Sequence, residues 1–340
     1  MQPESEAIDI ALHRRIPFYA YNHSGKTIFS AQPDSNYTCG EGFTAVPFDI
    51  CSTHPTVKIY RQLSAAETIK QCTAIPEQPL PVISSESTTY DGYMQSISEC
   101  LRQLQSGQLH KVVLSKVITT AHHIQSWGEF FDKLCETYPD AFKFVFFSEA
   151  TGAWIGATPE TLGEYQNSTF TTMALAGTRK RGTRSEWDDK DIREQSYVAQ
   201  YIADTIRSAG LESAMSERFT KQAGGVEHLC NTFTVRCTLA KARHLATTLH
   251  PTPALAGLPK QEAIDLINGT ESHDREYYGG YIGPFTETGF HYFVNLRSMK
   301  FDNTKCRIYA GGGIVAGSHP QSEWLETESK ALTLLSILNK

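Results

Sequence analysis

Three consecutive glycines near the C-terminus, residues 311–313, constrain the fold of this chain more than any other feature. An apolar run that ends at Ala310 enters the glycines, and a segment with helical spacing follows from Glu323. Adjacent glycines let a ligand approach the backbone closely, and exposed N–H groups there can bind an anion. The same stretch is compatible with a glycine-rich turn that leads into an amphipathic surface helix.

The segment after the glycines carries its charges on one helical face. Glu323 and Glu326 are three residues apart, and Lys330 follows Glu326 by four residues. A second carboxylate pair with the same spacing, Asp191 and Glu194, lies in the first turns of another predicted helix. Acidic residues at a helix start are ordinary, because they complement the helix dipole. If the two pairs meet, a hard cation such as Mg²⁺ would relieve their repulsion.

Composition excludes several classes of protein. The 340 residues are 40% hydrophobic and 20% charged, which is typical of a globular protein with a sizeable core. The formal net charge of −6 comes without a basic block, so nucleic acid is not an expected partner. No apolar run approaches the roughly 20 residues that span a bilayer, and the acidic N-terminus is unlike a signal peptide. The eight scattered cysteines lack a C-x-x-C pair, which favours a reducing, cytoplasmic location.

Local patterns predict helices, strands and two loops. Apolar residues at helical spacing predict helices over residues 90–106, 126–138 and 187–208. Runs of β-branched and aromatic residues predict strands or β-structure over residues 17–21, 43–48, 110–118, 142–147, 153–157, 170–176, 226–239 and 278–315. The stretch 62–90, rich in Ser, Thr, Glu and Pro, is the best linker or long-loop candidate. The proline-dense residues 250–259 predict an ordered loop that shapes a pocket.

Three further side chains are candidates for chemistry. Lys111 lies at the start of a predicted strand, where a lysine is ordinarily solvated. Glu160 follows a proline at a strand end, a rigid position that suits either a capping role or an acid. Arg297 is the single arginine of an aromatic strand and is a candidate carboxylate clamp. Together with Lys330 and the glycine amides, Lys111 and Arg297 would supply positive potential for an anionic substrate.

From about residue 90 to the C-terminus, the chain resembles the chorismate-utilising enzymes. This family includes isochorismate synthases, salicylate synthases, anthranilate synthase component I and aminodeoxychorismate synthase component I. Six segments in the same order carry the resemblance: residues 111–116, 156–160, 175–179, 250–257, 311–315 and 323–327. The loop sequence His-Pro-Thr-Pro-Ala-Leu-Ala-Gly is most typical of isochorismate synthases. Residues 1–90 match poorly and are expected to be a divergent part of the same fold, with residues 91–340 as the catalytic region.

The resemblance implies a fold and two catalytic roles. The fold is a single large α+β domain, in which two antiparallel-rich β-sheets face each other, helices cover the outside and the site lies in a cleft between the halves. Lys111 would be the general base that activates water. Glu160 would be the general acid that protonates the leaving hydroxyl.

The resemblance also implies a metal site and a substrate site. Glu194 and Glu326 would bind Mg²⁺ directly, while Asp191 and Glu323 would act through its waters. The implied substrate-binding residues are Gly177, Thr178, His228, Ala254, Leu255, Arg297, Gly312, Gly313 and Lys330. One departure concerns Gln195, since the family usually has His after the metal glutamate. This departure leaves the metal ligand intact and changes the hydrogen bonding around it.

The implied activity is that of an isochorismate synthase, an isomerase of the hydroxymutase type. Water adds at C2 of chorismate while the C4 hydroxyl leaves, and the product could enter menaquinone or siderophore biosynthesis. Anthranilate synthases carry Gln at the position of Lys111, as suits ammonia. Aminodeoxychorismate synthases carry a nucleophilic Lys where this chain has Ala176. Salicylate synthases tend to have Thr where this loop has Ala254, so the reaction is expected to stop at isochorismate. Further elimination of pyruvate, as in a salicylate synthase, is the alternative outcome.

The expected partners follow from this reading. Chorismate is the expected small-molecule substrate, and a glutamine amidotransferase subunit, a membrane and nucleic acid are not expected. The chain is expected to be a monomer. An alternative from another class is a catalytically silent chorismate-binding subunit, and the presence of Lys111 and Glu160 together with all four carboxylates argues against it.

Overall fold

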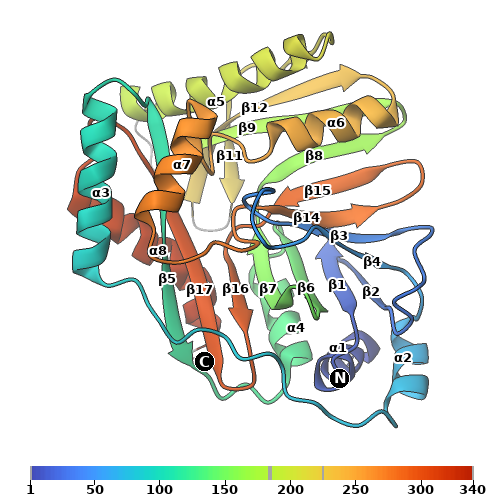
Figure 1. The fold of residues 1–340 in the computed structure, drawn as a ribbon. Coiled ribbons are helices and arrows are strands. Elements are labelled where there is room, and N and C mark those ends of the chain that lie inside the picture. The colour runs from blue at the N-terminus through green and yellow to red at the C-terminus, as the bar shows by residue number, and fades with distance from the viewer. Residues whose placement is uncertain (1, 183–185, 224–225, 339–340) are drawn as a thin grey trace.

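Two β-sheets face each other and helices cover their outer faces (Figure 1). The computed structural model describes residues 2–182, 186–223 and 226–338. All strand pairs within both sheets are antiparallel in this part of the chain. The predicted α+β class, with one large domain and two facing sheets, is confirmed.

The first sheet has eight strands and carries the glycine run at one end of a long strand. Its order is β13 (Gly257–Leu258), β5 (Lys111–Ala121), β17 (Lys305–Ile314), β16 (Ser298–Phe301), β7 (Gly152–Thr158), β6 (Phe142–Ser148), β1 (Phe18–His23) and β2 (Lys26–Ala31). Along the longest pairing, Gly312 of β17 is opposite Leu114 of β5. The start of β5 and the end of β17 therefore lie side by side.

The second sheet has nine strands. Its order is β10 (Ala214–Met215), β12 (Val226–Arg236), β9 (Thr169–Lys180), β8 (Thr161–Gln166), β15 (Phe290–Val294), β14 (Tyr281–Phe285), β3 (Gly42–Val46) and β4 (Val57–Tyr60), and β11 (Phe219–Ala223) also pairs with β12. The first ninety residues thus contribute strands to both sheets: β1 and β2 to the first, β3 and β4 to the second.

Helices cover the outer faces of the two sheets. The helices are α1 (Pro3–His13), α2 (Ala65–Cys72), α3 (Tyr90–Gln105), α4 (Trp127–Thr137), α5 (Asp189–Ser208), α6 (Leu239–Leu249), α7 (Lys260–Thr270) and α8 (Pro320–Leu338). One apolar cluster joins α1, α4 and α8 to the first sheet, and another joins α5 and α6 to the second. A further cluster packs α3 and α7 against β5. Among the helices described, none is long and apolar enough to cross a membrane.

The layer between the sheets is aromatic. Trp154 and Phe144 of the first sheet are buried in one cluster with Phe43 and Phe293 of the second. The rings of Phe142 and Phe293 stack across the interface with centroids 3.9 Å apart. Because such side chains are large and rigid, this packing fixes the spacing of the sheets and of the strand ends that bear the site.

Most local predictions agree with the structure, and some are wrong. Residues 62–90 are not wholly a linker, because α2 occupies Ala65–Cys72. A capping box begins this helix: the Ser64 hydroxyl accepts from Glu67 N, and the Glu67 carboxylate accepts from Ser64 N. The β-structure predicted over 226–239 ends at Arg236, and α6 begins at Leu239. The glycine run is neither a turn nor an exposed loop, because it is the last part of β17.

Candidate active site

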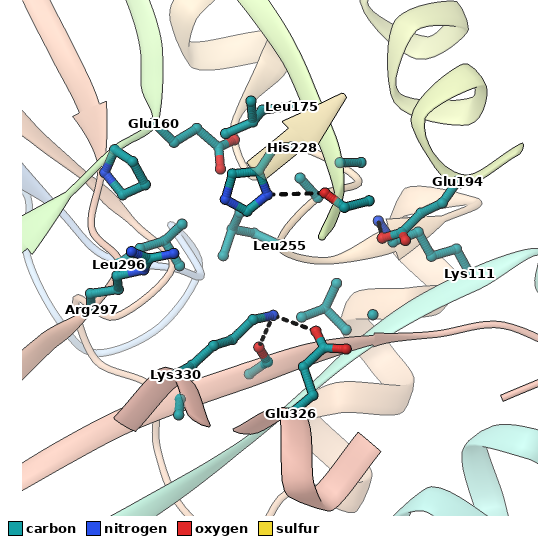
Figure 2. A pocket seen from close by; sticks show the side chains of 18 of the residues that line it. Lys111, Glu160, Leu175, Glu194, His228, Leu255, Leu296, Arg297, Glu326 and Lys330 are labelled. Atoms are coloured by element: carbon teal, nitrogen blue, oxygen red, sulfur yellow. Dashed lines mark hydrogen bonds and ion pairs between the residues drawn. The ribbon is translucent and has the colours of Figure 1, made fainter. Parts of the chain in front are cut away.

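A cavity of about 260 Å³ lies where the two sheets, the 250–259 loop and the first turns of α5 meet α8. Figure 2 shows Glu160 and Arg297 on one side of this cavity, with Lys111 and Glu194 on the other side. Lys330 and Glu326 approach from a third direction. The cavity therefore collects charged side chains from segments that are far apart in the sequence.

Lys111 is buried at the start of β5 and is paired with a carboxylate of α5. Its side chain is 1% exposed, and Lys111 Nζ lies 2.7 Å from Glu194 Oε1. Gly313 of β17 lies directly beside this pair. A Cβ atom at Gly313 would be 2.8 Å from Glu194 Oε1 and 3.2 Å from Lys111 Cε. The last glycine of the run therefore leaves the space that the ion pair occupies.

Glu160 is a buried acidic group just after the end of β7. It follows Pro159 after β7, and its backbone is held by Val294 N, which donates to Glu160 O at 3.0 Å. Burial raises the pKa of Glu160 to about 7, although the positive charges of Lys111, Lys221 and Lys330 oppose the rise. Near neutral pH a large fraction of this carboxyl group is protonated and can donate a proton.

Arg297 and Lys330 bring positive charge to the cavity. The Arg297 backbone has φ 47°, an unusual value for a residue other than glycine, and burial lowers the pKa of its guanidinium. Within the described part of the chain, no hydrogen bond or ion pair engages that guanidinium. Lys330 Nζ donates to Gly311 O at 2.9 Å and lies 2.7 Å from Glu326 Oε1. Both side chains suit carboxylate groups of a ligand.

His228 and Gly177 form one wall together. The imidazole Nδ1 of His228 donates to the carbonyl oxygen of Gly177 at 3.0 Å (Figure 2). Burial lowers the pKa of His228 to about 4, so the ring is neutral at pH 7. Gly177 has φ 71°, and a Cβ there would lie 3.1 Å from Asp191 Cβ. A glycine at this position lets β9 pass close to the start of α5.

The four predicted metal-binding carboxylates come to the same end of the cavity, three of them as lining residues. Glu194, Glu326 and Asp191 line it, whereas Glu323 is 2% exposed and lies behind them. In the described part of the chain, Lys111 pairs with Glu194, Lys330 pairs with Glu326, and Lys190 pairs with Glu323 at 3.3 Å. Among the residues described, no three His, Cys, Asp or Glu side chains are gathered as a metal-binding group.

The chemistry of these residues nevertheless fits a hard cation. Oε2 of Glu323 is buried and has no hydrogen-bond partner among the described atoms. A Cβ at Gly312 would lie 3.7 Å from this oxygen and 3.8 Å from Glu326 Oε1, so both carboxylates approach one place on β17. All four candidate ligands are carboxylates, whose oxygen atoms Mg²⁺ prefers. In this structure, lysine side chains offset the negative charge that a bound cation would neutralise.

Gln195, the departure from the family pattern, is fully buried and hydrogen bonded. Gln195 Nε2 donates to Asn231 Oδ1 at 2.6 Å, and Asn231 Nδ2 donates to Ser216 O at 2.8 Å. This chain of contacts ties α5 to β12 directly beside Glu194. The side-chain amide of Gln195 therefore anchors the start of α5 to β12 through its Nε2 atom.

Two predicted substrate residues either do not line the cavity or have side chains outside the described ones. Gly312 does not line the cavity, because alternate residues of a strand face opposite sides and Gly311 and Gly313 face the site. The side chain of Thr178 lies outside the described residues. Ala254 and Leu255 of the 250–259 loop line the cavity, as the prediction of a pocket-shaping loop implied. Sequence reasoning missed the buried tyrosines Tyr278 and Tyr309, which carry no local signal beyond aromatic alternation.

Two solved structures with this architecture are described as isochorismate synthases. The structure of MenF, the menaquinone-specific isochorismate synthase from Escherichia coli, matches with a TM-score of 0.78 at 22% identity, over 98% of this chain and 91% of that one. A putative 2,3-dihydroxybenzoate-specific isochorismate synthase, DhbC from Bacillus anthracis, matches with a TM-score of 0.78 at 22% identity, over 99% and 100%. These likenesses define the fold as that of chorismate-utilising enzymes.

Sequence comparison defines the family. A profile described as chorismate binding enzyme matches residues 46–339. Isochorismate synthase EntC of Escherichia coli (strain K12) is 32% identical over 279 residues, which cover 78% of this chain and 68% of EntC. Isochorismate synthase MenF of Haemophilus influenzae is 27% identical over 308 residues, which cover 86% and 71%. The chain belongs to the chorismate-binding enzymes, and the predicted membership is confirmed.

Proposed function

We propose that this protein is an Mg²⁺-dependent isochorismate synthase, which interconverts chorismate and isochorismate. The observation that carries the proposal is the placement of Lys111 and Glu160 on different sides of one cavity. Glu160 has the raised pKa of a proton donor, and Arg297 and Lys330 line the same cavity as partners for the substrate's carboxylates. A base, an acid and two cations in one cavity suit the exchange of a hydroxyl group on an anionic ring.

The reaction divides between the two sides of the cavity. Lys111 takes a proton from water as the water oxygen bonds to C2. The ring double bonds shift, and the bond from C4 to its hydroxyl breaks. Glu160 gives its proton to the departing hydroxyl, which leaves as water. The ion pair of Lys111 with Glu194 has to open before Nζ can approach that attacking water.

The carboxylates of α5 and α8 would hold the metal ion. Glu194 and Glu326 are proposed as direct ligands, with Asp191 and Glu323 acting through water. Bound Mg²⁺ supplies positive charge to the substrate's ring carboxylate and to the transition state. Ligation by Glu194 and Glu326 gives both side chains a partner other than the lysines that hold them in this structure.

The apolar wall supports isochorismate as the final product. Ala176, Ala254 and Leu255 present no amine or hydroxyl to the ring. Ala176 therefore cannot form a covalent amine intermediate with the ring. The apolar wall also offers no polar side chain that would stabilise the transition state of pyruvate elimination. The proposed enzyme acts as a monomer in the cytoplasm, and it needs no ammonia and no glutamine amidotransferase subunit.

The test of the proposed function is product analysis after incubation with chorismate and Mg²⁺. The expected result is a mixture of chorismate and isochorismate, reached from either compound and unchanged by adding glutamine or ammonium. Stoichiometric release of pyruvate with salicylate would identify a salicylate synthase instead. Binding of chorismate without turnover would identify a silent binding protein.

The activity is expected to fall as the pH rises through about 7, because burial raises the pKa of Glu160 to about 7 and the acid must be protonated to donate. Below that pH the carboxyl group is mostly protonated, and above it the protonated fraction decreases tenfold with each pH unit. The pH profile of kcat for the wild type and for Glu160→Gln checks this. The fall of kcat near pH 7 should be absent in Glu160→Gln. If the fall persists in this variant, a group other than Glu160 causes it.

A further inference from the structure

The loop of residues 250–259 forms part of the cavity wall and is attached to β5. Val113 N donates to Ala256 O at 2.7 Å, and His110 N donates to Leu258 O at 2.8 Å. These bonds flank Lys111 in the sequence. The loop wall and the proposed base are therefore parts of one short stretch of hydrogen-bonded backbone.

A buried arginine joins the same two segments from behind the cavity. Arg275, which follows α7, is 3% exposed. Its Nη1 donates to Leu255 O at 2.9 Å, and its Nη2 donates to Val113 O at 2.6 Å. Leu255 and Val113 both line the cavity, whereas Arg275 itself does not. One guanidinium thus holds the carbonyl groups of the loop wall and of β5 at a fixed separation.

Glu271 holds this arginine in place and also contacts β5. Arg275 Nε donates to Glu271 Oε2 at 2.8 Å, and the Ser115 N–H donates to Glu271 Oε1 at 2.6 Å. The ring of Phe48 lies 4.3 Å from the guanidinium carbon. Each of the three guanidinium nitrogens donates to at least one partner, and the partners come from different segments, so the arginine cannot turn without losing several contacts.

We propose that Arg275, oriented by Glu271, is a positioning residue for the reaction of this site. Lys111 and Val113 are two residues apart on one strand and face the same side, so a carbonyl held at Val113 also sets the direction of Lys111. We call the contacts of Arg275 with Leu255 O and Val113 O the clamp. The clamp fixes Lys111 relative to the cavity wall at Leu255, against which the substrate ring would lie. This inference rests on the proposed function for its catalytic consequence, whereas the clamp itself can be tested without turnover.

The experiment compares Arg275→Met with Arg275→Lys, Glu271→Gln and wild type. Arg275→Met removes both carbonyl contacts, while Arg275→Lys keeps the charge but lacks the planar fork. Arg14→Met is the matched control, because Arg14 bonds a carboxylate and a carbonyl, Glu77 Oε1 and Thr73 O, at a place away from the cavity. Steady-state kinetics with chorismate and Mg²⁺ and amide hydrogen exchange of residues 110–114 are the two readouts.

Arg275→Met is expected to lower kcat about 10²-fold, the effect that a displacement of about 1 Å can have on a positioned group. KM should change less than about threefold, the pattern of an interaction needed mainly in the transition state. Exchange at Val113 and His110 should accelerate, since their acceptors lie on the released loop. Arg275→Lys and Glu271→Gln should lie between Arg275→Met and wild type, and Arg14→Met should match wild type in kcat and in exchange.

Two results would overturn the proposal. One is a kcat within about threefold of wild type in Arg275→Met, well short of the loss expected for a displaced base. The other is a lowered kcat with unchanged exchange at Val113 and His110, since the loss would then not pass through the clamp. If Arg275→Met does not fold, the kcat values and the amide exchange of Arg275→Lys and Glu271→Gln test the proposal instead. If wild type does not convert chorismate, the proposed function fails, and the exchange data still test the clamp.

Discussion

Lys111→Ala is expected to lower kcat for isochorismate formation by about 10²–10⁴-fold, the usual effect of removing a positioned acid–base group. The reason is that water becomes nucleophilic only when a base accepts its proton, and Lys111 Nζ is the amine that lines the cavity opposite Glu160. Lys111→Gln should be as inactive, because an amide keeps much of the side-chain volume but cannot accept that proton. Initial rates of isochorismate formation check both variants.

The control for this prediction is another buried lysine of the first sheet. Lys143 is 1% exposed and donates to Pro139 O at 3.1 Å, outside the cavity. Lys143→Met should affect thermal stability while leaving kcat close to that of wild type. A loss in Lys111→Ala of less than about tenfold, below the range for acid–base groups, would assign the base role to another residue.

Removal of divalent cations by EDTA is expected to abolish activity, and added Mg²⁺ should restore it. Glu326→Gln should severely weaken the response to Mg²⁺, because it replaces a charged proposed ligand by a neutral one at the place that Glu323 Oε2 also approaches. The concentration of Mg²⁺ that gives half-maximal activity, and the Mg²⁺-induced rise in Tm, measure this.

The matched control lies two residues further along α8. Glu328 forms its ion pair with Lys116 and does not line the cavity. Glu328→Gln should therefore keep the wild-type dependence on Mg²⁺. Undiminished turnover in EDTA would refute the metal site, and an equal weakening in Glu328→Gln would attribute the effect to the general charge of α8.

Much of the fold could be predicted because it follows from local patterns and an ordered set of motifs. The helix at residues 90–106 has a clear apolar stripe, and Ser126 begins α4 as a hydrogen-bonded cap. Helix α2 could have been found from its capping box, although the surrounding prolines favoured a linker. In sequence, the glycine run is compatible both with a turn and with the β-structure predicted over residues 278–315, and its pairing with β5 shows that it is a strand.

Sequence motifs point to many of the residues that line the cavity, but not to their arrangement. The spacing of Glu323 and Glu326 indicates a shared face, yet only the structure places Glu323 behind the cavity and Glu326 on its wall. The raised pKa of Glu160 depends on burial by distant segments, which the local sequence does not contain. Arg275 lies outside every motif, and its importance emerges only from its contacts with Leu255 and Val113.

The most direct test of the central claim is conversion of chorismate with Mg²⁺ in H₂¹⁸O, followed by mass spectrometry and NMR of the first turnovers. The account predicts isochorismate with one ¹⁸O atom, located in the C2 hydroxyl, because the water activated by Lys111 becomes that group. It also predicts loss of this labelled product in Lys111→Ala. Unlabelled isochorismate would contradict the addition of water, and stoichiometric pyruvate with salicylate would contradict isochorismate as the final product.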